Sequence, residues 1–423
     1  MTCGAGWCGY RSRAVDGGAE VLVVGAGQAG LAVSHELSRT GVEHVVLEKD
    51  RIGETWRRRW DSFCLVTPNW SVLLPGHPYD GDDPDGFMSR EEVVGYLERY
   101  SGGFSAPVQE GIEVTSLRPL SGCFALKTSA GELEAPTVVL CTGAYQRPYR
   151  PAVAATLPPG LLQIDVEGYR NPEALPPGAV LVVGSGQSGC QLAEELHEAG
   201  REVFLSCGRA GWAPRQLGER DLFWWLREVG DLDDLSSSLQ SPQARLLGSL
   251  QATGHGGGHD LHYRTLQASG VTLLGHFRGV EGRHALFTAD LSESVAWADQ
   301  RHEQFMDRIR KLVAERGLRR VDTPEAEPFS CEAPERLDLR GLGVVVFTGG
   351  FRPDYQSWVH CPSAFDELGF PIQEDGASSV IHGMYFVGVH FLRKRKSSLL
   401  TGVGEDAALV AQKIAAERAA ATG

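Results

Sequence analysis

The residues with the clearest chemistry are the glycines of a phosphate-binding signature, GxGxxG, which occurs twice in the chain. Each copy follows a short apolar strand and opens a helix. The first glycine allows a tight turn, the second lets the backbone approach a pyrophosphate, and the third lets helix and strand pack closely. The pyrophosphate then lies at the positive end of the helix. Two copies predict a protein that binds two dinucleotides. The residues that these turns assign to the cofactors are Gly25, Gly27, Gly30, Gly184, Gly186, Gln187, Ser188 and Gly189.

The strand that follows each turn and helix indicates which dinucleotide binds. In the first unit it ends at Glu48, whose carboxylate can accept hydrogen bonds from a ribose 2′-OH. The second unit has Cys207 at the same place, and Arg209 and Arg215 follow it. Arginine in place of the acid suits a 2′-phosphate, which a guanidinium binds through two parallel hydrogen bonds. We interpret the first site as an FAD site and the second as an NADPH site. The alternative is that both arginines are ordinary surface residues.

Composition fits an ordinary globular protein and excludes several partners. The chain has 423 residues, of which 42% are apolar and 22% charged, and its net charge is −14. This charge argues against a nucleic-acid partner, and no apolar run approaches the roughly 20 residues that cross a bilayer. Residues 1–18 lack the apolar core of a signal peptide and are predicted to be a tail. The nine cysteines form no CxxC pair, as in a reducing compartment, so we expect a cytoplasmic protein.

The alternation of strands and helices predicts an α/β protein with parallel sheets. We expect two Rossmann-like dinucleotide-binding domains, one for FAD and one for NADPH, with the second inserted in the first. Proline-rich segments ahead of the second glycine turn mark the domain crossing. We assign residues 19–152 and 335–423 to the FAD-binding domain and residues 153–334 to the NADPH-binding domain.

Apolar spacing predicts further elements around the sites. The buried strands at residues 137–141 and 343–347 both lead into a Thr-Gly pair, and we assign Thr142, Gly143 and Gly349 to the cofactor site. Apolar residues at helical spacing predict helices at residues 90–100, 222–229 and 301–316.

Longer motifs extend over most of the chain and carry a family resemblance. They are GxxWRxRWDSFxLxTPN at residues 53–69, CTG at 141–143, FTGGFRPD at 347–354 and GVGEDA at 402–407. Together with the two glycine turns, they resemble the flavin-containing monooxygenase superfamily, also called class B flavoprotein monooxygenases. The chain looks most similar to its CzcO-like branch and to plant YUCCA-type enzymes in size and layout.

The resemblance implies a reaction. NADPH reduces FAD, the reduced flavin captures O2 as a C4a-hydroperoxide, and one oxygen atom passes to a small organic substrate. We expect attack by nitrogen or sulfur, since such atoms need no dedicated base. Asn69 matches an asparagine beside the flavin, with a turn residue after Pro68 as the alternative. The alternative functions are an NADPH-dependent flavin reductase or oxidase that makes hydrogen peroxide, and a non-catalytic flavin-bound sensor.

One departure from the family pattern lies before the second glycine turn. The family carries FxGxxxHxxxW there, and this chain has Asp165 at the histidine position and Tyr169 at the aromatic position. An acid in place of a possible imidazolium bears on how NADP⁺ is repositioned. We therefore count Asp165, with Asn69, as a candidate catalytic residue.

Other residues have both a cofactor interpretation and a structural one. Trp56 and Trp60 either pack along the flavin or anchor the core. The run of arginines at residues 57–59 either reaches a phosphate or is solvated. The turn that opens the last helix can face the flavin pyrimidine, and the basic segment 393–396 either reinforces it or coats the surface. The cofactor residues assigned in that turn are Gly404, Glu405 and Asp406.

Two more clusters remain. His255, His259 and His262 have metal-like spacing, but the glycines between them disfavour one helix presenting all three, so no metal site is predicted. The segment 223–225, Phe-Trp-Trp, either walls a substrate cavity or fills core. The expected partners are a small-molecule substrate and O2, with neither nucleic acid nor membrane. The oligomeric state stays open, with a homodimer as one option.

Overall fold

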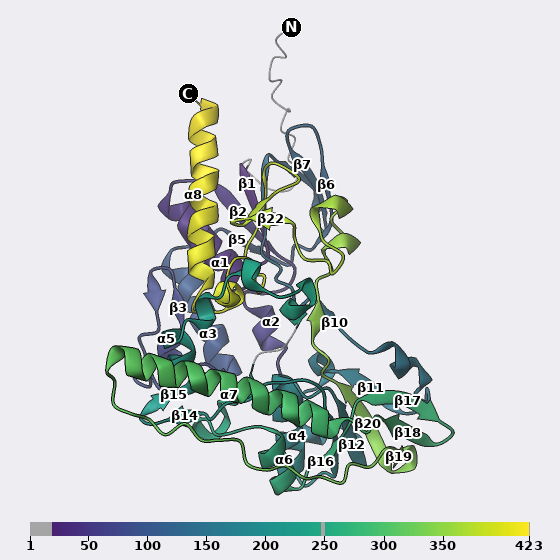
Figure 1. Ribbon diagram of the computed structural model, residues 1–423. Coiled ribbons are helices and arrows are strands. Elements are labelled where there is room, and N and C mark those ends of the chain that lie inside the picture. Colours follow the sequence, from purple (N-terminus) through teal and green to yellow (C-terminus); the bar gives the residue numbers. More distant parts are fainter. Residues whose placement is uncertain (1–18, 247–249, 423) are drawn as a thin grey trace.

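The computed structural model describes residues 19–246 and 250–422, so the predicted tail lies outside the described residues. The chain forms two lobes, one above the other, each built on a central sheet (Figure 1). The upper lobe is the first dinucleotide domain and the lower lobe is the second. Within the described ranges, no helix has both the length and the apolar character needed to cross a membrane.

The first domain contains a seven-stranded sheet in the order β22-β23-β24-β9-β1-β2-β5. Strand β1 is paired in parallel with β2 and β9. Helices α1 and α8 pack against each other through residues such as Leu31 and Val410, which lie in one buried apolar cluster with the inner strands. The elements are β1 (Val21–Val24), α1 (Gln28–Arg39), β2 (His44–Glu48), α3 (Arg90–Gly103), β5 (Val108–Glu110), β9 (Thr137–Leu140), β22 (Gln373–Glu374), β23 (Ala377–Ser378), β24 (Met384–Phe386) and α8 (Val403–Thr422).

The second domain contains a five-stranded parallel sheet in the order β11-β20-β12-β13-β16. Strand β12 corresponds to β1 of the first sheet. It lies between β13, which follows helix α4, and β20, which comes much later in the chain. The elements are β11 (Leu162–Asp165), β12 (Ala179–Val183), α4 (Gln187–Glu198), β13 (Val203–Ser206), α6 (Tyr263–Ser269), β16 (Thr272–Leu274), α7 (Leu291–Arg316) and β20 (Leu342–Phe347).

The predicted domain boundary at residue 335 is wrong. Strand β20 is hydrogen-bonded to β11 and β12, so it belongs to the second sheet. The chain returns to the first domain only after β21 (Phe351–Arg352), which pairs antiparallel with β10 (Arg147–Pro148). The two crossings between the lobes therefore run side by side as one short ribbon (Figure 1).

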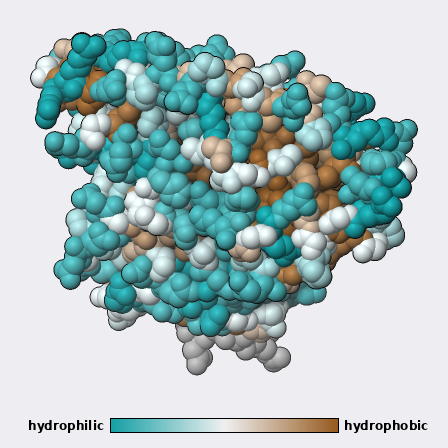
Figure 2. All heavy atoms as spheres, turned by 90° about the horizontal axis from the view of Figure 1, so that it is seen from below, coloured by the Kyte–Doolittle hydropathy of each residue, from teal (hydrophilic) through white to brown (hydrophobic). Residues whose placement is uncertain are grey.

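Smaller elements complete the two lobes. Helix α3 begins with a capping box between Ser89 and Glu92, and α7 ends at Gly317 in the left-handed conformation, with φ +59°. Seen from below, the second domain is mostly hydrophilic, with apolar side chains gathered toward the right (Figure 2). The remaining elements are α2 (Glu54–Arg57), β3 (Leu73–Leu74), β4 (His77–Pro78), β6 (Val114–Pro119), β7 (Phe124–Thr128), β8 (Gly131–Ala135), β14 (Gln216–Leu217), β15 (Arg220–Asp221), α5 (Leu222–Glu228), β17 (Phe277–Glu281), β18 (His284–Phe287) and β19 (Arg336–Asp338).

Candidate functional site: two dinucleotide cradles

The first glycine of each signature lies where a neighbouring strand ends. Gly25 has φ +102°, and a Cβ there would lie 2.9 Å from the Cys141 carbonyl oxygen. Gly184 has φ +112°, and its Cβ would lie 2.9 Å from the backbone of Thr348. Both positions therefore require glycine. Thr348 holds its place by donating from Oγ1 to the Gly184 carbonyl at 2.7 Å, so β20 supports the second turn as β9 supports the first.

The other signature glycines differ in whether protein atoms fill the space where a Cβ would lie. A Cβ at Gly30 would lie 1.8 Å from the Gly25 carbonyl oxygen, and a Cβ at Gly189 would lie 2.0 Å from that of Gly184. By contrast, a Cβ at Gly27 or Gly186 would meet nothing within 4 Å. The helix therefore packs tightly behind each turn and leaves open space in front. This geometry fits a pyrophosphate at each helix N-terminus.

Glu48 lies at the first cradle as predicted. Its carboxylate accepts hydrogen bonds from the backbone nitrogens of Ala26 at 2.7 Å and Asp50 at 3.0 Å. These bonds fix the acid beside the glycine turn at the end of β2. A ribose 2′-OH at this edge of the sheet would meet the carboxylate.

The two arginines assigned to the second cradle differ. Arg209 is exposed two residues after Cys207 and forms no ion pair with any described residue, so its position fits the predicted 2′-phosphate contact. Arg215 does not fit, because it is only 3% exposed and pairs with Asp221 at 2.6 Å. Its Nη1 also donates to the Val66 carbonyl at 2.8 Å, which joins the second domain to the first. The assignment of Arg215 to the cofactor is wrong for this reason.

The two Thr-Gly pairs serve different domains. Gln146 donates from Nε2 to Thr142 Oγ1 at 2.6 Å and to the Gly143 carbonyl at 2.8 Å, at the end of β9. Gly349 follows β20, and a Cβ there would lie 2.9 Å from the Tyr149 carbonyl oxygen. Gly349 therefore lies beside the second cradle and the crossing, and its assignment to the flavin domain is corrected.

Helix α4 opens with the other two residues assigned to the second cradle. Gln187 donates from Nε2 to the Leu250 carbonyl at 3.3 Å, and Ser188 is half-buried beside it. Both occupy the first turn of the helix, where backbone amides face the open space.

Trp56 and Trp60 also have different surroundings. Trp56 donates from Nε1 to Gln28 Oε1 at 3.1 Å, and Gln28 donates to the Ser398 carbonyl at 3.1 Å. These bonds bring three segments together at the start of α1, near the first cradle. Trp60 is buried in the apolar cluster of the second domain with Tyr169. The structural alternative therefore holds for Trp60, and its cofactor assignment is not supported.

The side chain of Asn69 is hydrogen-bonded to the backbone of a neighbouring loop. It is 3% exposed, its Nδ2 donates to the Asp83 carbonyl at 2.9 Å, and its Oδ1 accepts from the Met88 nitrogen at 2.7 Å. These bonds hold the loop between residues 83 and 88. The turn alternative fits this geometry, and a catalytic role finds no support in it.

Asp165 lies at the end of β11, beside the crossing between the domains. Its two carboxylate oxygens accept from Nε and Nη2 of Arg150 at 2.7 and 2.8 Å. This bidentate pair balances the charge that the acid introduces and ties the crossing segment to the second sheet. The geometry fits a positioning role, and a catalytic role stays a prediction.

The start of α8 belongs to an ionic cluster. Lys394 and Lys396 pair with Glu405 at 3.0 and 2.6 Å, and Arg393 pairs with buried Asp406 at 2.9 Å. Burial raises the pKa of Asp406. Gly404 packs so closely that a Cβ would lie 2.9 Å from Pro75 Cγ. The acids of this turn thus have protein partners, while its backbone amides stay at the helix N-terminus.

The basic segment 393–396 also reaches the second domain. Lys394 and Lys396 pair with Asp233 at 2.8 and 3.0 Å, and Arg395 pairs with Asp234 at 3.1 Å. Backbone bonds from Arg395 to Asp234 and from Ser236 to Arg393 join the same segments. We call residues 231–236 and 393–396 the interdomain clasp. Neither earlier alternative for the basic segment, flavin contact or surface coat, describes this role.

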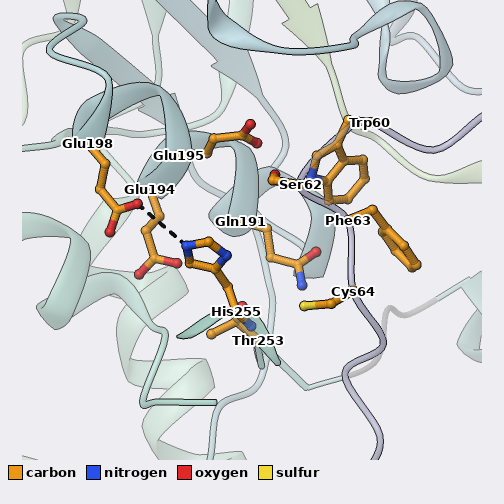
Figure 3. A pocket seen from close by; sticks show the side chains of 10 residues that line it. All are labelled: Trp60, Ser62, Phe63, Cys64, Gln191, Glu194, Glu195, Glu198, Thr253 and His255. Atoms are coloured by element: carbon orange, nitrogen blue, oxygen red, sulfur yellow. Dashed lines mark hydrogen bonds and ion pairs between the residues drawn. The ribbon is translucent and has the colours of Figure 1, made fainter. Parts of the chain in front are cut away.

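A separate small pocket lies between α4 and the segment 60–64 (Figure 3). Its lining includes Glu194, Glu195 and Glu198 from α4, and His255 beside them, which pairs with Glu198 at 3.9 Å. His259 binds Glu194 at 2.7 Å, while His262 is buried against Trp212, so the three histidines point to different partners. Within residues 19–246 and 250–422, no group of three or more potential ligands could hold a metal ion.

The Phe-Trp-Trp segment mostly fills core. Phe223 and Trp225 are buried, and Trp225 donates from Nε1 to the Leu217 carbonyl at 3.1 Å. Phe223 also approaches Trp70 of the first domain, with ring centroids 5.8 Å apart. The segment therefore contributes to the contact between the domains.

Sequence reasoning missed an aromatic wall, formed by Tyr145 and His390, at the carboxyl ends of β9 and β24. Tyr145 is 49% exposed and stacks on His390, with centroids 5.4 Å apart and planes at 14°. Tyr145 lies two residues after Gly143, which follows β9, and His390 lies two residues after Gly388, which follows β24. The two strands are parallel neighbours in the first sheet. The position of both rings after strand-ending glycines was the available signal.

Comparison with known proteins agrees with this architecture. The family model for pyridine nucleotide-disulphide oxidoreductases matches residues 22–227. A CzcO-like oxidoreductase of Geobacillus kaustophilus is 32% identical over 394 residues, covering 92% of this chain and 96% of the relative. The probable indole-3-pyruvate monooxygenase YUCCA4 of Arabidopsis thaliana is 31% identical over 184 residues, covering 41% of this chain and 43% of the relative. The solved flavin-containing monooxygenase of Stenotrophomonas maltophilia has a TM-score of 0.65 at 18% identity, covering 94% of this chain and 98% of that one.

The chain therefore belongs to the CzcO-like oxidoreductases. The predicted resemblance and the fold, two Rossmann-like domains with the second inserted in the first, are confirmed. The similarity to flavin monooxygenases supports FAD and NADPH as cofactors and a flavin-dependent monooxygenase as the enzyme class.

Proposed function

We propose that this enzyme uses NADPH in preference to NADH and transfers one oxygen atom from O2 to nitrogen or sulfur of a small organic substrate. The observation that carries the proposal is the pair of glycine cradles, with Arg209 at the second, exposed and without an ion pair to any described residue. Bound FAD would supply the electron transfer and the oxygen chemistry. The chain's own residues would bind, orient and shield the reactants.

The roles of these residues follow from their positions. The amides at the start of α1 and α4 would bind the two pyrophosphates, and Glu48 would bind the ribose of FAD. Arg209 would bind the 2′-phosphate. The Tyr145–His390 wall would exclude water from the space between the cradles.

The electrostatics of the wall support nitrogen or sulfur as the oxygenated atom. Burial lowers the pKa of His390 to about 4 and raises the pKa of Tyr145, so both side chains are uncharged at neutral pH. An uncharged wall suits a neutral, soft nucleophile that reacts without losing a proton to a general base.

A coupling experiment tests the proposal. The purified protein with FAD is given NADPH, ¹⁸O2 and a panel of amines and sulfides, and labelled product is measured beside NADPH oxidation and hydrogen peroxide. We expect labelled product in proportion to NADPH consumed for at least one compound. Stoichiometric peroxide with every compound would instead indicate an oxidase or reductase. Failure of NADPH to bleach the flavin would indicate a sensor.

A further inference from the structure

The two glycine turns are joined to the end of the next strand in different ways. In the first domain, the Glu48 carboxylate accepts a hydrogen bond at 2.7 Å from the backbone nitrogen of Ala26, which lies between the first two signature glycines. The second turn has Ser185 at that position, and Cys207 takes the place of the acid. Ser185 is only 3% exposed, and its Oγ accepts a hydrogen bond from the backbone nitrogen of Gly208 at 2.8 Å. In the second domain, a side chain of the turn itself therefore makes the contact that the acid makes in the first.

A tyrosine at the start of α6 closes this contact into a ring of hydrogen bonds. The Tyr263 hydroxyl lies 2.6 Å from Ser185 Oγ and donates to the Gly208 carbonyl at 2.5 Å. Because the tyrosine proton goes to that carbonyl, the serine donates its own proton to the tyrosine oxygen. Every donor in the ring thus has an acceptor. Tyr263 is 2% exposed, and burial raises its pKa, so the hydroxyl keeps the proton that it donates.

Gln251 holds the same segment on the other side of Arg209. Its Nε2 donates to the Ser185 carbonyl at 2.9 Å, and its backbone nitrogen donates to the Gly211 carbonyl at 2.8 Å. Gly208 before the arginine and Gly211 after it are therefore both connected to the second glycine turn. The backbone of Arg209 is fixed relative to that turn, while its side chain remains exposed.

We propose that Tyr263 and Ser185 are positioning residues for nucleotide specificity, which hold Arg209 beside the second glycine turn so that its guanidinium meets the 2′-phosphate of NADPH. This inference rests on the proposed function in assigning that phosphate to Arg209. The pyrophosphate binds at the turn and the 2′-phosphate at the end of the next strand, so the ring of hydrogen bonds joins two places that recognise one molecule. A fixed backbone also leaves less freedom to be lost when the flexible arginine binds.

Nucleotide binding to the flavin-loaded protein tests this role without turnover. NADP⁺ and NAD⁺ are titrated by calorimetry into the wild type, Tyr263→Phe and Ser185→Ala. The serine substitution suits the turn, because the first glycine turn has Ala26 at the same position. We expect the affinity for NADP⁺ to fall about fivefold in each variant and the affinity for NAD⁺ to stay within about twofold, since the lost hydrogen bonds loosen the arginine and leave the turn in place.

Two further measurements separate positioning from a general loss of stability. In an Arg209→Gln background, Tyr263→Phe should change the NADP⁺ affinity no further, because the tyrosine acts through the arginine. Hydrogen exchange at residues 207–211 should be several-fold faster in Tyr263→Phe, while exchange in β12 stays as slow as in the wild type. Tyr96→Phe is the matched control, because Tyr96 is equally buried and donates to the His77 carbonyl in the first domain. It should change neither the nucleotide affinities nor the exchange at residues 207–211.

The outcomes distinguish this inference from the proposed function. A wild type that prefers NADP⁺ and keeps its preference in both variants would overturn the inference alone, as would an equal loss of affinity for both nucleotides. A wild type without a preference would refute the assignment of Arg209 and the inference with it. If both variants lose the preference but the wild type makes only hydrogen peroxide, oxygen transfer is refuted and the inference stands. If Tyr263→Phe fails to fold, Ser185→Ala decides alone.

Discussion

Charged side chains around the two cradles differ in whether folding gives them a protein partner. Arg215 is buried against Asp221, while Arg209, from the same stretch of sequence, remains exposed. Arg58 and Arg59 are neighbours that differ in the same way. Since a guanidinium keeps its charge in either setting, the unpaired members are the ones available to ligands.

Arg209 gives the sharpest prediction at this scale. Arg209→Gln should raise the Michaelis constant for NADPH at least tenfold and change that for NADH less than twofold, because only NADPH carries the 2′-phosphate. Steady-state flavin reduction with each nucleotide measures both constants. Arg227→Gln is the control, since Arg227 is 46% exposed in the same domain and pairs with Glu228. Equal effects on the Michaelis constants for both nucleotides would contradict a contact between Arg209 and the 2′-phosphate.

A second residue-scale prediction concerns pH. His262 is buried against Trp212, and burial lowers its pKa to about 4 from the 6.5 of a free histidine. Between these values the unfolded chain binds more protons than the folded chain, so stability rises with pH and is lost as pH falls from 6.5 to 4. The difference is about 3 kcal/mol at most.

We therefore expect His262→Gln to flatten the dependence of Tm on pH between pH 6.5 and 4. His259→Gln serves as the comparison, because His259 is 41% exposed and bound to Glu194. A slope as steep in the His262 variant as in the wild type would contradict the prediction.

At the scale of elements, the strand–turn–helix units explain both the success and the limits of sequence reasoning. The glycine turns, Glu48 and the nested order of the domains were predictable, because spacing alone determines them. The sheet to which β20 belongs was not predictable. Both β9 and β20 lead into a Thr-Gly pair, so the sequence alone does not say which of them joins which sheet. The choice between the two interpretations of Trp60 and Asn69 could not be made from sequence, because their partners, Tyr169 and Asp83, are distant or unmarked there.

The second cradle offers a matched pair of glycine substitutions. Gly184→Ala should lower Tm without nucleotide, by an amount equivalent to about 1–3 kcal/mol, because φ is +112° and the new Cβ would meet Thr348. Gly186→Ala should leave Tm nearly unchanged, since its Cβ meets nothing within 4 Å. Its methyl group should instead weaken NADP⁺ binding at least tenfold by filling the space for the pyrophosphate. Thermal unfolding and calorimetry separate the two outcomes, and similar behaviour of both variants would argue against the cradle.

For the whole molecule, the interdomain clasp and the crossing ribbon define how the lobes are joined. Single exposed ion pairs contribute little, but the clasp combines several of them with backbone hydrogen bonds. We expect Asp233→Asn to speed hydrogen exchange at residues 231–236 and 393–398 several-fold while exchange in β1 and β12 stays as slow as before. Asp338→Asn is the control, because Asp338, at the end of β19, pairs with Arg340 and lies outside the clasp. No change at the clasp would show that its ionic contacts are dispensable.

The pairing of β10 with β21 also limits how the lobes can move. Two separate connections would let the lobes twist and slide, whereas two strands bonded to each other bend more easily than they shear. We therefore expect the ribbon to act as a hinge with one preferred axis, with Arg352, Tyr149 and Phe351 on or beside it. Opening and closing about this axis would widen or narrow the space in front of Tyr145 while keeping the two cradles in register.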